Sequence, residues 1–219
     1  MRPLIFAFTL SLMAGAAVAA TPDDPEAHYQ ALLAAAKASA PNADWLGLRL
    51  AFAARPGFNA FGQTDAKRRM FFAAEHSDCA TALPAAKAQI EESYIDIDAH
   101  LVAAFCEENA GDRVASQLDR DIGAGLIASI RTGDGLAPAT AFLPIDVAEE
   151  YSVMRALGAK VTQQALRQLG GHAYDVLTAV DAKGQTVTYY FQIDRVLAAE
   201  SAALKPGAVS EGGPPDRTP

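Results

Sequence analysis

The segment from Gly170 to Asp175 holds the residues whose types and spacing come nearest to a catalytic site. Two glycines lead into His172, Tyr174 and Asp175. Histidine is a common general base near neutral pH, and a carboxylate can orient its ring. A small hydrolase-like centre would use His172 as the base and Asp175 as its partner. We therefore take His172, Tyr174 and Asp175 as the candidate binding residues.

Two features argue against a reaction at this segment. Side chains alternate across a strand, so Asp175 points away from His172 and Tyr174 unless the turn twists. No serine or cysteine stands in a recognisable nucleophile elbow. We assign no catalytic residue, and we expect His172 to cap the turn and to bind backbone groups.

Cys79 and Cys106 are the two cysteines of the chain. We expect one near the start of a helix and the other near the end of the next helix, so an antiparallel pair would bring them together. In an oxidising compartment this predicts a disulfide, worth roughly 3.5 kcal/mol in the chain-entropy model. The alternative is a pair of buried free thiols.

A zinc site is the competing interpretation of the same region, because His76 and His100 lie near the two cysteines in the sequence. His100 and Cys106, six residues apart on a helix, point about 120° from each other and are separated by about 9 Å of rise. Zinc needs ligands within about 2.3 Å in a tetrahedron. We predict no metal site, and no motif predicts a cofactor.

The adjacent carboxylates Glu149 and Glu150 do not form a facing acid–base pair, because neighbouring helical residues point about 100° apart. Glu149 has capping-box spacing from Asp146. We interpret Glu149 as the partner in that cap and Glu150 as a solvated surface charge.

The elements that must position these residues are helical in the first part of the chain. Apolar periodicity and capping residues predict helices at about 23–40, 45–55, 65–76, 79–92, 97–109 and 113–132. Pro84 lies awkwardly in the fourth of these, so that helix starts nearer Thr81 or is kinked.

Strand signals follow residue 133. They predict a short strand at 141–145, a helix at 147–158, a weak strand at 160–168 and a hairpin over 173–193. Pairing Val180 with Gln185 places Tyr174 opposite Phe191, with the even-numbered residues 174–180 on the apolar face. Grouped helices before grouped strands predict an α+β fold, with helices packed on a small, mainly antiparallel sheet.

The N-terminus predicts export. Arg2, the apolar run from Leu4 to Met13 and the small residues Ala17-Val18-Ala19 are typical of a cleavable signal peptide, expected over 1–20. We expect a periplasmic protein with a helical subdomain at 21–132, an α+β subdomain at 133–199 and a disordered tail at 200–219.

Composition excludes some functions. The chain has a formal net charge of -8 and no basic stripe, which argues against nucleic-acid binding. No later segment reaches the roughly 20 apolar residues that a membrane span needs.

Several stretches together resemble one bacterial family. They are DWLGLRLAFAA at 44–54, YIDIDAHLVA at 94–103, residues 125–135, EEYSVMRALG at 149–158, GHAYDVL at 171–177 and YYFQID at 189–194. These stretches are similar to the family catalogued as domain of unknown function 4919. Residues 78–110 also resemble a tetratricopeptide-type helix pair. One departure is Phe58-Asn59-Ala60-Phe61, where the family tends to carry a Tyr-x-Pro-Tyr-like segment. The resemblance implies a fold and no known activity.

Two functions are compatible with these observations. The favoured one is a non-catalytic, soluble periplasmic interaction or ligand-binding protein, with a possible protein partner in the cell envelope. The alternative is a small periplasmic hydrolase-like enzyme that uses His172 and Asp175.

Overall fold

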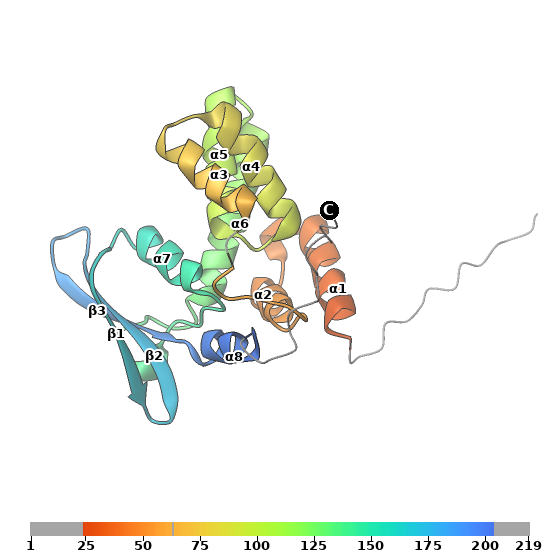
Figure 1. Ribbon diagram of the computed structural model, residues 1–219. Helices are drawn as coiled ribbons and strands as arrows, with labels where there is room; N and C mark the ends of the chain where they lie inside the picture. The colour runs from red at the N-terminus through yellow and green to blue at the C-terminus, as the bar shows by residue number, and fades with distance from the viewer. Residues whose placement is uncertain (1–23, 63, 204–219) are drawn as a thin grey trace, which may run out of the picture.

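The computed structural model describes residues 24–62 and 64–203 and shows an α+β fold, as the sequence predicts (Figure 1). A helical bundle stands at one end of the molecule and a three-stranded sheet at the other, and helix α7 (Val147–Ala156) lies between them (Figure 1). The helices of the first part are α1 (Pro25–Ala38), α2 (Trp45–Ala53), α3 (Asp65–Glu75), α4 (Cys79–Glu92), α5 (Ile97–Ala110) and α6 (Arg113–Ile130), with a short 3-10 turn η1 at Ala40–Asn42.

Side-chain caps explain where these helices begin. The residue before each helix accepts a hydrogen bond from a backbone N–H of the first turn, which satisfies a donor that the helix itself cannot pair. The capping residues are Asp24, Asp44, Thr64, Asp78, Asp96, Asp112 and Asp146. Helix α4 runs through Pro84, so a start nearer Thr81 is wrong.

The C-terminal part comprises α7 (Val147–Ala156), β1 (Lys160–Leu169), β2 (His172–Val180), β3 (Thr186–Gln192) and α8 (Asp194–Ala203), after a 3-10 turn η2 at Pro138–Thr140. The strands form an antiparallel meander in the order β1-β2-β3. Gly170 and Gly171 both have positive φ, of 59° and 86°, which a two-residue hairpin turn requires. They join Leu169 to His172 across the first hairpin.

The predicted register of the second hairpin is wrong by one residue. Val180 pairs with Thr186 and Tyr174 with Gln192. Asp181 N–H donates to the Gln185 carbonyl at 2.9 Å, so the loop has three residues and ends at Gly184, whose φ is 78°. This slip turns the odd-numbered residues of β2 toward the main core, because side chains alternate along a strand. Those residues are Ala173, Asp175, Leu177 and Ala179.

Two other expectations at the sheet are corrected. The predicted strand at 141–145 is reduced to one bridge, in which Phe142 pairs with Phe191. Helix α8 continues to Ala203, so residues 200–203 are not part of a disordered tail. The rest of the expected tail and the expected signal peptide lie outside the described residues.

The main hydrophobic core joins the helical part to the sheet. Helix α6 contributes Leu126 and Ile130, the sheet contributes Leu177 and Phe191, and α7 contributes Met154. A smaller cluster around Met70 holds α3, α4 and α5 together. No helix in the described part of the chain is long and apolar enough to cross a membrane.

Candidate functional site

The candidate His172 lies on the surface at the start of β2, with 54% of its side chain exposed. Its Nδ1 lies 2.6 Å from Oδ2 of Asp194, the first residue of α8. The other carboxylate oxygen of Asp194 accepts the Ala173 N–H at 2.8 Å. The expectation that His172 binds backbone is therefore wrong, because its partner is a carboxylate.

Asp175 lies on the opposite face of β2 from His172 and is buried. Its Oδ2 accepts a hydrogen bond from the Gln164 amide of β1. Tyr174 is also buried, with its ring edge-to-face with Tyr190 at 6.3 Å between centroids. The structure thus does not bring His172 and Asp175 together, and the general base of the hydrolase alternative lacks the partner assigned to it.

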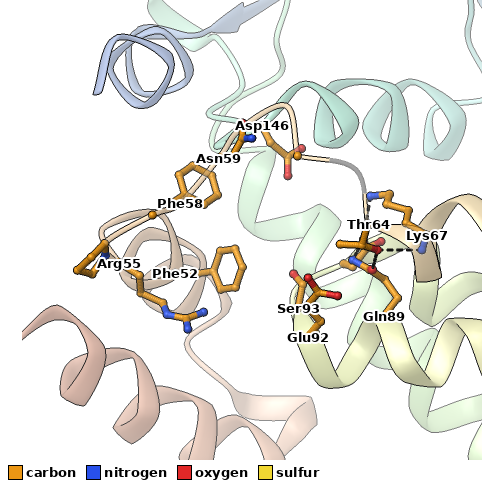
Figure 2. Close-up of a pocket in the computed structure, with 14 residues that line it drawn as sticks. Phe52, Arg55, Phe58, Asn59, Thr64, Lys67, Gln89, Glu92, Ser93 and Asp146 are labelled. Carbon is orange, nitrogen blue, oxygen red and sulfur yellow. Dashed lines mark hydrogen bonds and ion pairs between the residues drawn. The ribbon is translucent and has the colours of Figure 1, made fainter. Parts of the chain in front are cut away.

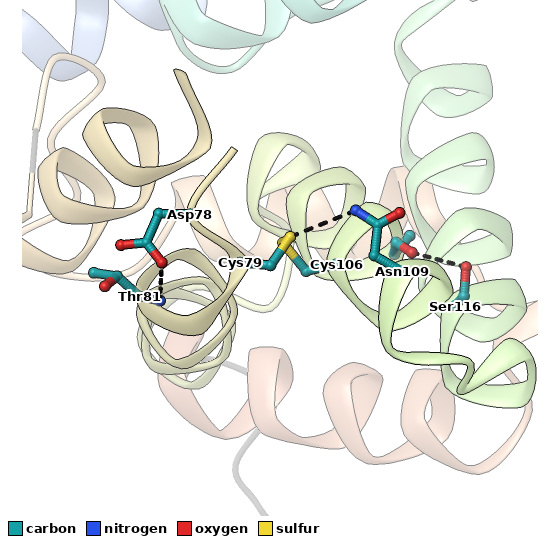
Figure 3. The surroundings of a disulfide bond; sticks show 7 residues. Asp78, Cys79, Thr81, Cys106, Asn109 and Ser116 are labelled. Atoms are coloured by element: carbon teal, nitrogen blue, oxygen red, sulfur yellow. Dashed lines mark hydrogen bonds between the residues drawn. A yellow bond between two sulfur atoms is a disulfide. The ribbon is translucent and has the colours of Figure 1, made fainter. Parts of the chain in front are cut away.

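The predicted disulfide is confirmed. Cys79 and Cys106 are joined, with Cα atoms 5.2 Å apart, and tie the start of α4 to the end of α5 (Figure 3). Asn109 donates a hydrogen bond to Cys79 Sγ at 3.7 Å. His100, the other zinc candidate, is buried and binds Asp119 Oδ1 and the Tyr94 carbonyl. No group of metal-binding side chains occurs among the residues described.

Glu150 is not a surface charge, because only 1% of it is exposed. Its carboxyl group faces Asp175 of β2. Burial, followed by the charge of Asp175 and a hydrogen bond to it, raises the pKa of Glu150 to about 9. Glu150 therefore keeps its proton at neutral pH, and a protonated carboxyl can donate a hydrogen bond to a neighbouring carboxylate.

A pocket of about 390 Å³ lies where the helical bundle meets the start of α7, and we call it the α7 pocket (Figure 2). It is bounded by residues 55–62, the starts of α3 and α7, and the segment from the end of α4 to the start of α5. Its main lining residues are Phe52, Arg55, Phe58, Asn59, Thr64, Lys67, Gln89, Glu92, Ser93, Asp96 and Asp146.

One side of the α7 pocket is a closed polar network. Lys67 Nζ lies 2.8 Å from Asp96 Oδ2, and the Gln89 amide donates to the same oxygen at 2.9 Å. Thr64 donates its hydroxyl to Gln89. Burial alone lowers the pKa of Lys67, but the carboxylate of Asp96 outweighs it, so the pKa is raised overall. Lys67 therefore stays a cation, held by a partner inside the protein.

Asp146 closes the pocket from the α7 side and caps that helix. Its Oδ1 accepts the Glu149 N–H at 2.8 Å. Burial, followed by the negative charge of Glu149, raises the pKa of Asp146 to about 7. It makes no ion pair within residues 24–62 and 64–203. This carboxyl group therefore changes charge close to neutral pH.

A buried ion pair fixes the position of Asp146. Arg49 of α2 is fully buried, and its Nε donates to Glu149 Oε1 at 2.7 Å. Arg49 also donates to the Leu143 carbonyl at 2.9 Å, and Glu149 Oε2 accepts the Ile145 N–H at 2.8 Å. The predicted capping box is thus half formed, because the Glu149 side chain binds Arg49 and Ile145.

Sequence patterns did not predict the α7 pocket. The capping-box spacing pointed to Asp146 as a cap, but no pattern indicated a role for Lys67 or Asp96. Lys67 lies on a helix and Asp96 caps the start of one, and polar residues are common at both kinds of position. The two residues come together only through the packing of α3 against the start of α5. The repeated acidic pattern Asp96-Ile97-Asp98 was the available signal. Asp96 pairs with Lys67, while Asp98 pairs with Arg155 of α7.

Comparison with known proteins identifies a family but no activity. The family model described as Domain of unknown function (DUF4919) matches residues 26–202. No curated protein and no solved structure matches the chain.

Proposed function

The chain belongs to the family described as Domain of unknown function (DUF4919), and since that description names no reaction, we propose a binding role from the geometry. The protein holds a small ligand in the α7 pocket and performs no chemistry on it. This deepens the expectation of a non-catalytic ligand-binding protein by naming the place where the ligand sits.

The observation that carries the proposal is the lining of the pocket. Its volume of about 390 Å³ is within the range typical of small-molecule sites. Two aromatic rings, Phe52 and Phe58, face a cluster of polar side chains across it (Figure 2). Apolar surface with a few convergent polar groups is the usual composition of a ligand site.

Among the residues that the structure describes, no hydroxyl in this lining is hydrogen-bonded to a base that could activate it, which favours binding over catalysis. Ser93 and Thr64 are the hydroxyl side chains of the pocket, and Thr64 donates its proton to Gln89. Asp146 changes charge near neutral pH, but its Oδ1 is already used to cap α7 and no described hydroxyl of the lining is hydrogen-bonded to it.

We also propose that the protein works outside the cytoplasm, in the periplasm. The disulfide between Cys79 and Cys106 supports this proposal, because such bonds persist in oxidising compartments. The signal-peptide pattern of residues 1–20 points the same way.

The proposal is tested by placing a large side chain at the rim of the α7 pocket and measuring whether ligand binding is lost. Ligand-detected NMR with a fragment set of amines, carboxylic acids, alcohols and sugars should find binders to the wild-type protein. Glu92 lines the pocket and is exposed, so Glu92→Trp should abolish this binding by occupying the space. Glu91→Trp, on the exposed neighbouring residue outside the lining, should leave it intact. Equal binding to both variants would show that the fragments bind elsewhere, and no binder at all would reject the pocket as a ligand site.

A protein partner is the second candidate, and exposed apolar side chains on α5 favour it. Leu101 and Phe105, one helical turn apart, are 38% and 51% exposed. Helices α4 and α5 form the pair that we propose to be tetratricopeptide-like, a type of unit that commonly contributes to protein-binding surfaces. A photo-crosslinker at Phe105 should then give a discrete product in intact cells, which Leu101→Glu removes. The same product from a crosslinker at Leu166, on β1, would contradict this surface.

A further inference from the structure

The positive charges in the lining of the α7 pocket are neutralised by partners inside the protein. Lys67 is paired with Asp96, and Arg55 is paired with Glu26 at 2.6 Å. The Arg55 guanidinium also lies over the Phe52 ring, 5.2 Å from its centroid. Neither cation of the lining is therefore available to a ligand without losing an existing ion pair.

Two carboxyl groups of the lining have no such partner. Asp146 and Glu92 make no ion pair in the described part of the chain. Asp146 uses Oδ1 to cap α7, which leaves Oδ2 for a ligand donor. The nearby carboxylate of Glu149 is already bound by Arg49. The uncompensated charge of the pocket is therefore negative.

The side of the pocket opposite the polar network is aromatic. The rings of Phe52 and Phe58 meet edge-to-face, with centroids 5.7 Å apart. Aromatic faces attract cations and also bury apolar carbon. The pocket thus offers a negative group and an apolar surface at the same time.

We propose that the ligand of the α7 pocket is a small organic amine, bound as its ammonium ion. This inference rests on the proposed binding function and specifies its ligand class. The ammonium group donates to Asp146, and the apolar body of the molecule lies against Phe52 and Phe58. An anionic ligand fits poorly, because it would meet Asp146 and Glu92 while Lys67 is held by Asp96.

Binding should depend on pH through Asp146. The groups that face it are Lys67 of α3, Asp96 at the start of α5 and Glu149 of α7. With the pKa of Asp146 at about 7, the ionised fraction rises from about a tenth at about pH 6 to about nine tenths at about pH 8. An alkylamine stays protonated over this range. Apparent affinity should therefore rise about tenfold across it, because affinity scales with the competent fraction.

The experiment is calorimetric titration of the disulfide-bonded protein with three matched probes: 2-phenylethylamine, 2-phenylethanol and 3-phenylpropionate. The amine should bind at least about tenfold more tightly than the other two. Asp146→Asn should weaken amine binding by about tenfold or more, because asparagine keeps the cap but removes the charge. Asp112→Asn is the matched control, because Asp112 caps α6 through the Ala115 N–H in the same way. It should leave amine binding unchanged.

Glu92→Gln provides a second variant in case Asp146→Asn impairs folding. It removes the other uncompensated charge from an exposed position and should weaken amine binding by a few fold. Tighter binding of the alcohol or the acid than of the amine would overturn the amine inference. If Glu92→Trp blocked that tighter binding, the α7 pocket would still be supported as a ligand site. Absence of binding by all three probes would also reject the amine as the ligand. Whether the α7 pocket binds any ligand is tested separately by the NMR experiment with the fragment set.

Discussion

Two carboxyl groups, Glu150 of α7 and Asp175 of β2, face each other inside the protein. One oxygen of each has no hydrogen-bond partner within the part of the chain described. The raised pKa of Glu150 means that the folded protein keeps a proton there that the unfolded chain releases. The contribution of Glu150 to the free energy of unfolding is fully present below about pH 4.5. It is lost as pH rises toward about 9.

Glu150→Gln should remove that loss, because a neutral amide can still donate to Asp175. Between about pH 8 and 9, Asp146 is already largely ionised, so Glu150 is the group that decides how the free energy of unfolding changes with pH. The free energy of unfolding of the wild type should fall over this range, and the variant should gain about 1–3 kcal/mol relative to it. Urea unfolding at several pH values measures the fall in the wild type and the difference between wild type and variant. Parallel curves for wild type and variant would contradict the proton on Glu150, and Glu91→Gln serves as the exposed control.

Sequence patterns located Glu149 and Glu150 correctly on a helix but misjudged the environment of Glu150. A surface charge and a buried one look alike in a helical pattern when the partner comes from a strand 25 residues further along the chain. His172 shows the same limit, since its partner Asp194 begins a helix that the pattern did not predict. Side-chain partners depend on packing between distant segments, which local periodicity does not encode.

At the scale of elements, the disulfide joins two helices that otherwise pack through small residues. The cluster between α3, α4 and α5 is built from Met70 and several alanines. Alanine buries little apolar area, so this bundle gains less from the hydrophobic effect than the main core does. The disulfide between Cys79 and Cys106 offsets this smaller hydrophobic stabilisation, where the start of α4 meets the end of α5.

Replacing both cysteines by alanine should therefore lower the free energy of unfolding by about 3 kcal/mol, given a sequence separation of 27 residues. Urea unfolding measures the change. Reduction of the wild type should bring it to the level of the double variant, and the double variant should not respond to reductant. A difference below about 0.5 kcal/mol would show that packing alone holds the helix pair.

Helix positions were predictable because capping residues and apolar spacing act locally. The register of β2 and β3 was not, because it depended on whether the turn held three residues or four. Asp181 settles this by accepting N–H groups from both Lys183 and Gln185 at 2.8 Å, which closes the shorter loop. One residue at a turn thus decides which face of a strand enters the core.

At the scale of the whole molecule, the α7 pocket exists because two parts of the chain share one core. Arg49 of α2 reaches Glu149 of α7 and holds the start of that helix against the bundle. The fold class could be predicted from grouped helices and strands. The pocket could not, because its walls come from segments between residues 52 and 146 whose contacts are long-range.

The backbone amide of Glu149 reports directly on whether an ammonium group binds Asp146 in this pocket, because its N–H donates to Asp146 Oδ1. We would titrate ¹⁵N-labelled protein with 2-phenylethylamine at about pH 8 and follow this amide. The signal of Glu149 should shift and saturate together with those of Asn59 and Ser93, and these shifts should be absent in Asp146→Asn. An unmoved Glu149 signal at saturating amine, or shifts confined to residues outside the pocket, would contradict it.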